Sequence, residues 1–249
     1  MLYREIAPTP MLAPYVRCVW TLDVETQTTF NPEPVFPDGS MELVFHLGEP
    51  FREVRAKDGE RVQQPSFLVG QMHSALMLRP HPLSRVVGVR FLPGGAYPFL
   101  RFPQVEAAGR LVPLTELWNA AIGRLQEQLS ASTLAAASVQ VQRFLCDQLH
   151  PQAAGAFHRL DTTKISDRQH RRLFRQIVGL SPRDLAALRR FQRALRLIPQ
   201  LDLPSAAAAS GYYDQSHMAL DFRRFAGITP SQWRGQQLAL TASFVSESS

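Results

Sequence analysis

Two segments of the chain repeat one local design, and this design restricts the C-terminal part to short packed helices. The segments are ISDRQHRRLFRQIVGLSP, residues 165–182, and YDQSHMALDFRRFAGITP, residues 213–230. Each starts with a polar residue that can cap a helix and ends in Gly, an aliphatic residue, Ser or Thr, and Pro. A capping oxygen stabilises the first helical turn, whereas Gly followed by Pro ends a helix. Each segment is therefore predicted to be one short helix.

The residues around these segments predict more helices. A longer helix opens at residues 181–184 and is closed by Pro199, and a short Ala-rich helix occupies residues 204–210. Gly211 can adopt the backbone conformation of a tight turn, and Asp214 can cap the helix that follows. A helix, a Gly-containing turn and a second, capped helix form the helix-turn-helix pattern.

The positive charge of the chain is concentrated in its C-terminal part. The net charge is +6, but residues 1–150 hold 13 Lys and Arg against 14 Asp and Glu, while residues 151–249 hold 14 against 7. This asymmetry predicts an anionic partner for the C-terminal part. Apart from Lys57 and Lys164, all basic residues are Arg. Arginine suits bidentate contacts with phosphate or guanine, although a GC-rich genome gives the same preference.

The C-terminal third resembles the DNA-binding domain of AraC-type (AraC/XylS) transcriptional regulators. GYYDQSHMALDFRRFAGITPSQWR follows the family signature almost throughout, and SDRQHRRLFRQIVGLSP also matches it. The resemblance implies two helix-turn-helix units joined by a linker helix, which enter successive major-groove segments of double-stranded DNA. It also implies that the bound protein recruits or excludes RNA polymerase, with activation the commoner outcome in the family.

The resemblance, together with the helical period, indicates which residues meet DNA. A recognition helix places its early residues against base edges. In the first unit the outward residues are Arg168, Gln169, Arg171, Arg172 and Arg175; in the second they are Gln215, Ser216, His217, Ala219, Leu220 and Arg223. Arg175 and Arg223 suit phosphate contacts. Leu220 stands where the family often has Arg, so the second unit is expected to position the protein more than to read sequence.

The N-terminal part is predicted to be rich in β-strands. Apolar residues alternate over residues 16–22 and 41–47, with the turn Pro37-Asp38-Gly39 between them, and residues 66–70, 75–80 and 85–91 indicate further strands. Helical spacing replaces this alternation over residues 113–129 and 134–149. The N-terminal half resembles a regulatory module of uncharacterised type found on one subgroup of the family, through PDG at 37–39, RVVGVRFLPGG at 85–95 and the helix that contains Trp118.

These patterns together predict an α+β chain of two domains. Residues 1–150 form a β-rich, barrel-like or sandwich-like regulatory domain that ends in helices, and residues 151–236 form an all-α double helix-turn-helix domain. Residues 237–249 form a loose tail. The helices over about 111–150 either cover the β domain or form a homodimer contact. The chain contains no apolar run near the roughly 18 residues of a membrane span, and its start lacks a signal-peptide core, so we expect a cytoplasmic protein that does not bind membranes.

The regulatory domain either encloses a mostly apolar small-molecule effector or has a solid core. The candidate lining residues are Trp20, Phe45, His46, His73 and Phe91.

Two other classes of function compete with a regulator. The first is a metal-binding β-barrel enzyme fused to a DNA-binding domain, since several His residues in a β-rich domain could hold a metal ion, but the sequence contains neither a His-x-His pair nor HExxH. We therefore expect no catalytic residue, no metal and no cofactor. A non-specific basic DNA-binding protein would carry scattered Lys and no paired reader helices, which is the opposite of this sequence.

Overall fold

The structure, a computed structural model, describes residues 1–25, 30–55, 59–100, 102–161 and 166–236. The tail predicted for residues 237–249 lies outside this range. The strands are β1 Leu2–Ile6, β2 Val16–Asp23, β3 Glu33–Val35, β4 Glu42–His46, β5 Arg52–Arg55, β6 Gly59–Val62, β7 Ser66–Val69, β8 Leu76–Arg79, β9 Arg85–Phe91 and β10 Leu111–Pro113. The helices of the N-terminal part are α1 Tyr97–Leu100, the 3-10 turn η1 Gln104–Ala107, α2 Thr115–Ser130 and α3 Leu134–Gln148.

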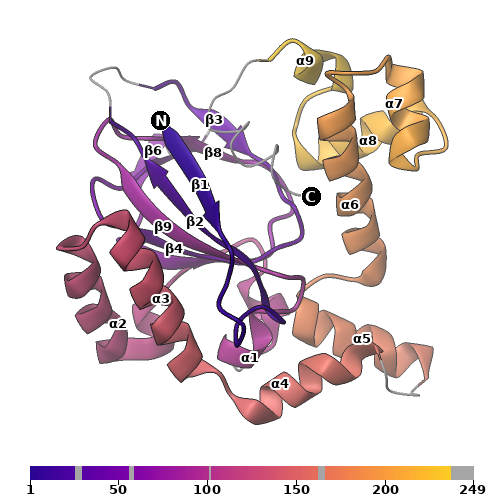
Figure 1. The fold of residues 1–249 in the computed structure, drawn as a ribbon. Helices are drawn as coiled ribbons and strands as arrows, with labels where there is room; N and C mark the ends of the chain where they lie inside the picture. Colours follow the sequence, from indigo (N-terminus) through magenta and orange to yellow (C-terminus); the bar gives the residue numbers. More distant parts are fainter. Residues whose placement is uncertain (26–29, 56–58, 101, 162–165, 237–249) are drawn as a thin grey trace.

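The strands form two antiparallel sheets. The larger sheet has the order β1-β2-β9-β4-β7-β10 and the smaller one the order β3-β8-β5-β6. In the larger sheet, β9 pairs with both β2 and β4, so Val87 lies between Thr21 and Phe45. The sheets are sandwich-like and do not close into a barrel (Figure 1). This decides between the two alternatives left by the strand pattern.

Each face of the larger sheet is covered by a different layer. Val19, Phe45 and Val87 belong to a core that also contains Ile122 of α2 and Val141 of α3. Their neighbours Trp20, Val44 and Val86 instead pack with Leu78 of the smaller sheet. Successive side chains of a strand point to opposite faces, which explains the division. The apolar stripes of α2 and α3 thus cover this sheet.

Helix α2 begins two residues later than its apolar spacing predicts. Leu111–Pro113 pairs with β7 as the edge strand β10, which holds that segment in an extended conformation. Asn119 has a φ of 43°, so the helix is kinked within its second turn. The apolar spacing therefore predicts the helix correctly but places its first residue too early.

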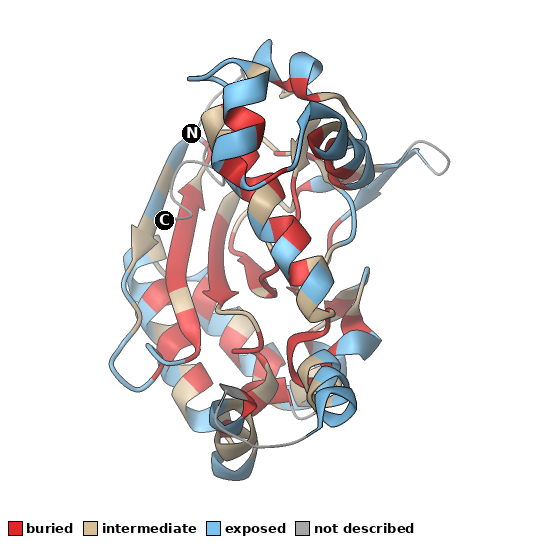
Figure 2. Cartoon of the chain, turned by 90° about the vertical axis from the view of Figure 1, so that its right-hand side faces the viewer, coloured by how far each residue is buried: buried red, intermediate tan, exposed pale blue. Residues whose placement is uncertain are grey.

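The C-terminal part is helical. Its elements are α4 Pro151–His158, the 3-10 turn η2 Arg159–Asp161, α5 Asp167–Val178, α6 Pro182–Leu197, α7 Leu203–Ser210, α8 Gln215–Phe225 and α9 Pro230–Arg234. The apolar sides of α5 to α9 share one core, in which Phe191 of α6 contacts Phe222 and Phe225 of α8 at ring-centroid distances of 5.0 and 5.3 Å. In Figure 2 exposed residues cover the outer sides of these helices.

The segment at the predicted domain boundary is helical. Ala154 of α4 belongs to the core of the N-terminal part, and Phe157 contacts Tyr15 there at a ring-centroid distance of 5.5 Å. The Tyr15 hydroxyl and His158 Nε2 also lie 3.0 Å apart. The start of the C-terminal part is thus packed against the N-terminal part.

Candidate nucleic-acid interface and effector cavity

Helix α5, the first predicted reader helix, is capped at both ends. The Ser166 hydroxyl accepts a hydrogen bond from the backbone N–H of Gln169. In return, Gln169 Oε1 accepts from the backbone N–H of Ser166 at 3.2 Å, which completes a capping box. Gly179 ends the helix with a φ of 83°, a left-handed conformation that favours glycine. The side chain of Gln169, a predicted DNA contact, is thus engaged in the cap.

The remaining predicted contacts on α5 form one basic face. Arg168, Arg171, Arg172 and Arg175 are exposed and line a single hollow together with Gln176 and Ser181. Within the described part of the chain, none of these four arginines makes an ion pair. The opposite side of α5 buries Ile177. Four guanidinium groups on one helix face suit a polyanion such as DNA.

Pro103 and Val105 of the N-terminal part also line this hollow. The face of α5 that is predicted to meet DNA therefore lies beside η1.

Helix α8, the second predicted reader helix, follows the same plan. Gly211 has a φ of 86°, and Asp214 Oδ1 accepts from the His217 amide at 2.7 Å. Met218, Phe222 and Phe225 are buried. The predicted contacts lie on the other side: Gln215, Ser216, His217, Leu220 and Arg223 are exposed and Ala219 is half-buried. Leu220 keeps 63% of its surface exposed, so it can contact a thymine methyl group.

The two neighbouring arginines at the end of α8 differ in their partners. Arg224 Nη2 donates to Asp184 Oδ1 of α6 at 2.8 Å. The pKa of Asp184 is lowered, first by the Ser181 hydroxyl that donates to it and then by Arg224. Arg223 is exposed and makes no ion pair among the described residues. Arg224 thus holds α8 against α6, while Arg223 remains available for phosphate.

Several buried contacts join the N-terminal part to the reader helices. Gln71 Nε2 donates to the carbonyl of Val178 at the end of α5, and the Ala75 amide donates to the carbonyl of Phe225 at the end of α8. Phe36 packs edge-on against Phe191 at a ring-centroid distance of 5.8 Å. Both reader helices therefore end against the N-terminal part.

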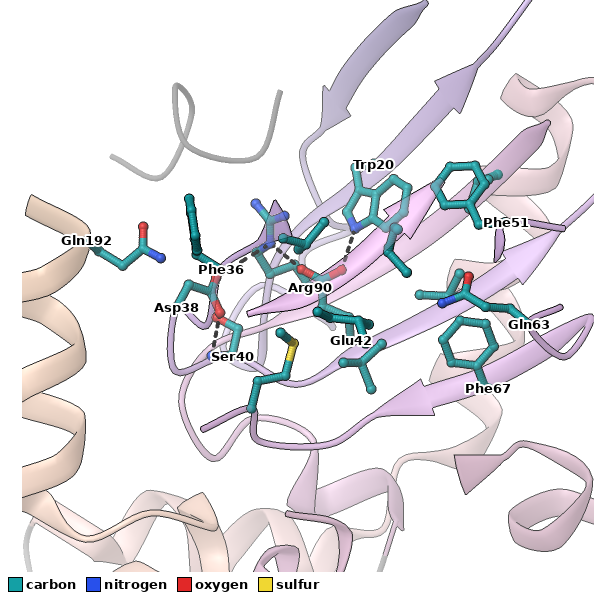
Figure 3. A pocket seen from close by; sticks show the side chains of 17 residues that line it. Trp20, Phe36, Asp38, Ser40, Glu42, Phe51, Gln63, Phe67, Arg90 and Gln192 are labelled. Atoms are coloured by element: carbon teal, nitrogen blue, oxygen red, sulfur yellow. Dashed lines mark hydrogen bonds and ion pairs between the residues drawn. The ribbon is translucent and has the colours of Figure 1, made fainter. Parts of the chain in front are cut away.

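A cavity lies between the two sheets and reaches α6 (Figure 3). Its volume is about 70 Å³, several times the roughly 10–15 Å³ that one water molecule needs. Most of its walls are apolar, including Trp20, Phe51 and Phe67, and Gln192 of α6 contributes to its far end. The cavity thus has walls from both parts of the chain.

Of the five residues predicted to line a pocket, Trp20 alone lines this cavity. Phe45 and Phe91 lie in the core under α2 and α3, on the other face of the sheet. His46 is buried beside the cavity, where its Nε2 lies 3.2 Å from Gln63 Oε1. His73 is exposed.

A buried ion cluster lies beside the cavity. Arg90 Nε donates to Glu42 Oε1 at 2.6 Å and lies 3.8 Å from Asp38 Oδ2, and Trp20 Nε1 donates to Glu42 Oε2 at 3.2 Å. Burial raises the pKa of Glu42, and Arg90 opposes that shift. The guanidinium therefore holds two carboxylates at one end of the cavity.

Most of the residues that line the cavity were not predicted from the sequence, among them Ser40 and Gln192. Ser40 follows the turn at residues 37–39, which gave no sign of a ligand site. Gln192 offered a signal, because it lies four residues after Leu188 on the apolar stripe of α6. A polar side chain on a buried stripe must find a polar partner or a ligand.

The described residues hold no group of three or more His, Cys, Asp or Glu arranged to bind a metal ion. Among their helices, none combines the length and the apolar character that a membrane crossing requires.

Comparisons with known proteins match both parts of the chain. Residues 4–113 match a domain of unknown function (DUF6597), and residues 160–236 match a helix-turn-helix domain. No curated protein matches the chain. One solved structure of ToxT from Vibrio cholerae shares 11% identity and a TM-score of 0.39, covering 94% of this chain and 98% of that one. A fatty-acid-bound ToxT shares 13% identity and a TM-score of 0.37, covering 86% and 93%. Likenesses this weak support no conclusion about this chain.

The helix-turn-helix domain match, together with two capped helices whose predicted contact faces are exposed, defines a DNA-binding transcription regulator. Its helix-turn-helix domain is of the AraC type, and a DUF6597 domain precedes it.

Proposed function

We propose that this protein binds specific DNA sites by placing α5 and α8 in successive major-groove segments, with α6 fixing their spacing. The observation that carries the proposal is the exposure of predicted reader residues on both helices, while their apolar sides share one core. Base readout by α5 relies on Arg168, Arg171 and Arg172, since Arg is suited to guanine. Helix α8 offers mainly short or apolar groups and therefore positions the protein.

A gel-shift competition tests this proposal. A labelled site selected from random DNA is challenged with unlabelled copies of itself and with bulk DNA. Specific reading predicts that the selected site competes at least a thousandfold better than bulk DNA. Equal competition would favour the non-specific architectural alternative.

The regulatory arrangement forms the second part of the proposal. Residues 1–150 act as the control domain and residues 151–236 as the DNA-binding domain, and the bound protein recruits RNA polymerase as an activator in the cytoplasm, where the DNA is. Support comes from the contacts of Gln71, Ala75 and Phe36 with the reader helices or their core. Run-off transcription from a promoter that carries the selected site distinguishes activation from repression.

Helices α2 and α3 offer a homodimer contact as well as a cover for the sheet. Their inner sides are buried, while Val139 on the outer side of α3 is 56% exposed. A dimer would let two copies occupy paired sites. Sedimentation at micromolar concentration tests this, and a strict monomer both with and without DNA would remove the dimer.

A further inference from the structure

The two ends of the cavity between the sheets differ in chemistry. Trp20, Phe51 and Phe67 line its apolar part, whereas Asp38, Ser40 and Gln192 lie toward the α6 end, with the Glu42 carboxylate between them and Trp20 (Figure 3). An occupant that fits both ends needs an apolar body and one polar group.

Two buried polar atoms at the α6 end have no hydrogen-bond partner in the part of the chain that the structure describes. Gln192 is only 7% exposed, and its Nε2 donates to the carbonyl of Pro37 at 2.7 Å. That bond fixes the orientation of the amide, because a carbonyl can only accept. Gln192 Oε1 and Ser40 Oγ have no hydrogen-bond partner among the described residues, and Ser40 is 6% exposed. Leaving a buried acceptor unsatisfied is unfavourable, so a ligand that donates to it is favoured.

The charges at this end decide which ligand group fits. Asp38 and Glu42 both line the cavity, and Arg90 is already engaged by their carboxylates. A ligand carboxylate could accept from Ser40 Oγ, but it would also face two carboxylates and the Gln192 carbonyl oxygen, none of which can donate to it. A hydroxyl can donate to Gln192 Oε1 and accept from Ser40 Oγ.

We propose that this cavity binds a small, uncharged, apolar molecule that ends in a hydroxyl group, held by Gln192 and Ser40. The regulatory consequence rests on the proposed function: because Gln192 belongs to α6, which joins the two reader helices, the occupant is the effector that controls their placement on DNA.

Calorimetric titration of the full chain without DNA tests the site with three matched probes. 2-Phenylethanol carries the hydroxyl, ethylbenzene lacks it, and phenylacetate replaces it with a carboxylate. We expect 2-phenylethanol to bind roughly ten- to hundredfold more tightly than ethylbenzene, the contribution of two neutral hydrogen bonds. Phenylacetate should bind more weakly than both.

Two variants identify the groups that hold the hydroxyl. Ser40→Ala and Gln192→Leu should each weaken binding of 2-phenylethanol about three- to tenfold and change ethylbenzene binding less than twofold. Gln200→Leu, at an exposed position just after α6, serves as the matched control and should change neither.

Three results would overturn the proposal: no binding of 2-phenylethanol to the folded full chain, phenylacetate binding as tightly as 2-phenylethanol, or unchanged 2-phenylethanol binding in both cavity variants. These titrations contain no DNA, whereas the gel-shift competition contains no probe. Failure of the ligand site can therefore be distinguished from failure of the DNA-binding proposal.

Discussion

Gln71 and Val178 are joined by a buried hydrogen bond that spans 107 residues of sequence, with Gln71 Nε2 lying 3.0 Å from the Val178 carbonyl. The same amide donates to the carbonyl of Gly39 at 3.0 Å, and Gln71 is fully buried. The end of the first reader helix is therefore fixed to the turn at residues 37–39 through one side chain.

Replacement of this amide should destabilise the whole chain. Gln71→Leu leaves the carbonyls of Val178 and Gly39 without their donor, and we expect a loss of about 1–3 kcal/mol in the free energy of unfolding. Urea denaturation measures the change. The exposed Gln176 of α5 provides the control, since Gln176→Leu should change stability by less than about 0.5 kcal/mol. Equal stability of the two variants would contradict the bridging role of Gln71.

The glycine that ends α5 should be less replaceable than the one that precedes α8. Gly179 and Gly211 have φ values of 83° and 86°, so alanine is strained at either position by about 1 kcal/mol. At Gly179 a Cβ would also lie 2.9 Å from Gln71 Cγ, whereas at Gly211 the nearest atom is 3.7 Å away. Thermal unfolding should show a larger loss for Gly179→Ala than for Gly211→Ala. The reverse order would mean that the contact with Gln71 relaxes without cost.

Two arginines of α5 should affect DNA binding differently. Arg172→Ala should weaken binding to the selected site by roughly 1–3 kcal/mol and relax the preference at one base pair. Arg175→Ala should weaken binding to all sequences alike. It should also reduce, by about one, the slope of the logarithm of the binding constant against the logarithm of the salt concentration. Fluorescence anisotropy at several salt concentrations measures both effects. Arg124→Ala, at an exposed position on α2, is the control. If Arg172→Ala changed neither the affinity for the selected site nor the base-pair preference, α5 would face DNA with another side than the one proposed.

Stability should fall on mild acidification because of His46. Burial lowers the pKa of His46 from 6.5 to about 4. Between these values the unfolded chain binds a proton that the folded chain does not, so folding stability decreases as the pH falls through this window. The slope approaches about 1.4 kcal/mol per pH unit.

Urea denaturation of His46→Gln and of the unchanged chain between pH 6.5 and 5 isolates this contribution. The carboxylate contributions are common to both proteins and cancel in the difference. The variant should lose less stability than the unchanged chain over this interval. Parallel curves would show that the pKa of His46 is the same in the folded and unfolded chains.

The sequence by itself determined the elements whose causes are local. Ser166 and Asp214 cap the two reader helices as the pattern predicts, because a cap and its helix amides lie within three residues of each other. The exposed faces of α5 and α8 follow from helical period alone, since the apolar side of each must be buried. Strands β2 and β4 were likewise visible as alternation, and β9 as a further short strand.

Tertiary structure decided which faces of the helices and sheets pack against one another. Alternation shows which residues of one strand share a side, but that Phe45 and Trp20 lie on opposite faces of the sheet is set by the register between strands and by packing among distant segments. The short strands β3, β5 and β6, which the sequence pattern did not indicate, form because partner strands are available beside them. Ser40 and Gln192, separated by 152 positions in the sequence, line one cavity because α6 lies against the turn at residues 37–39. Contacts between residues so far apart in the sequence depend on the whole folded chain. Helix caps and the periodic spacing of apolar residues depend only on residues that are neighbours in the sequence.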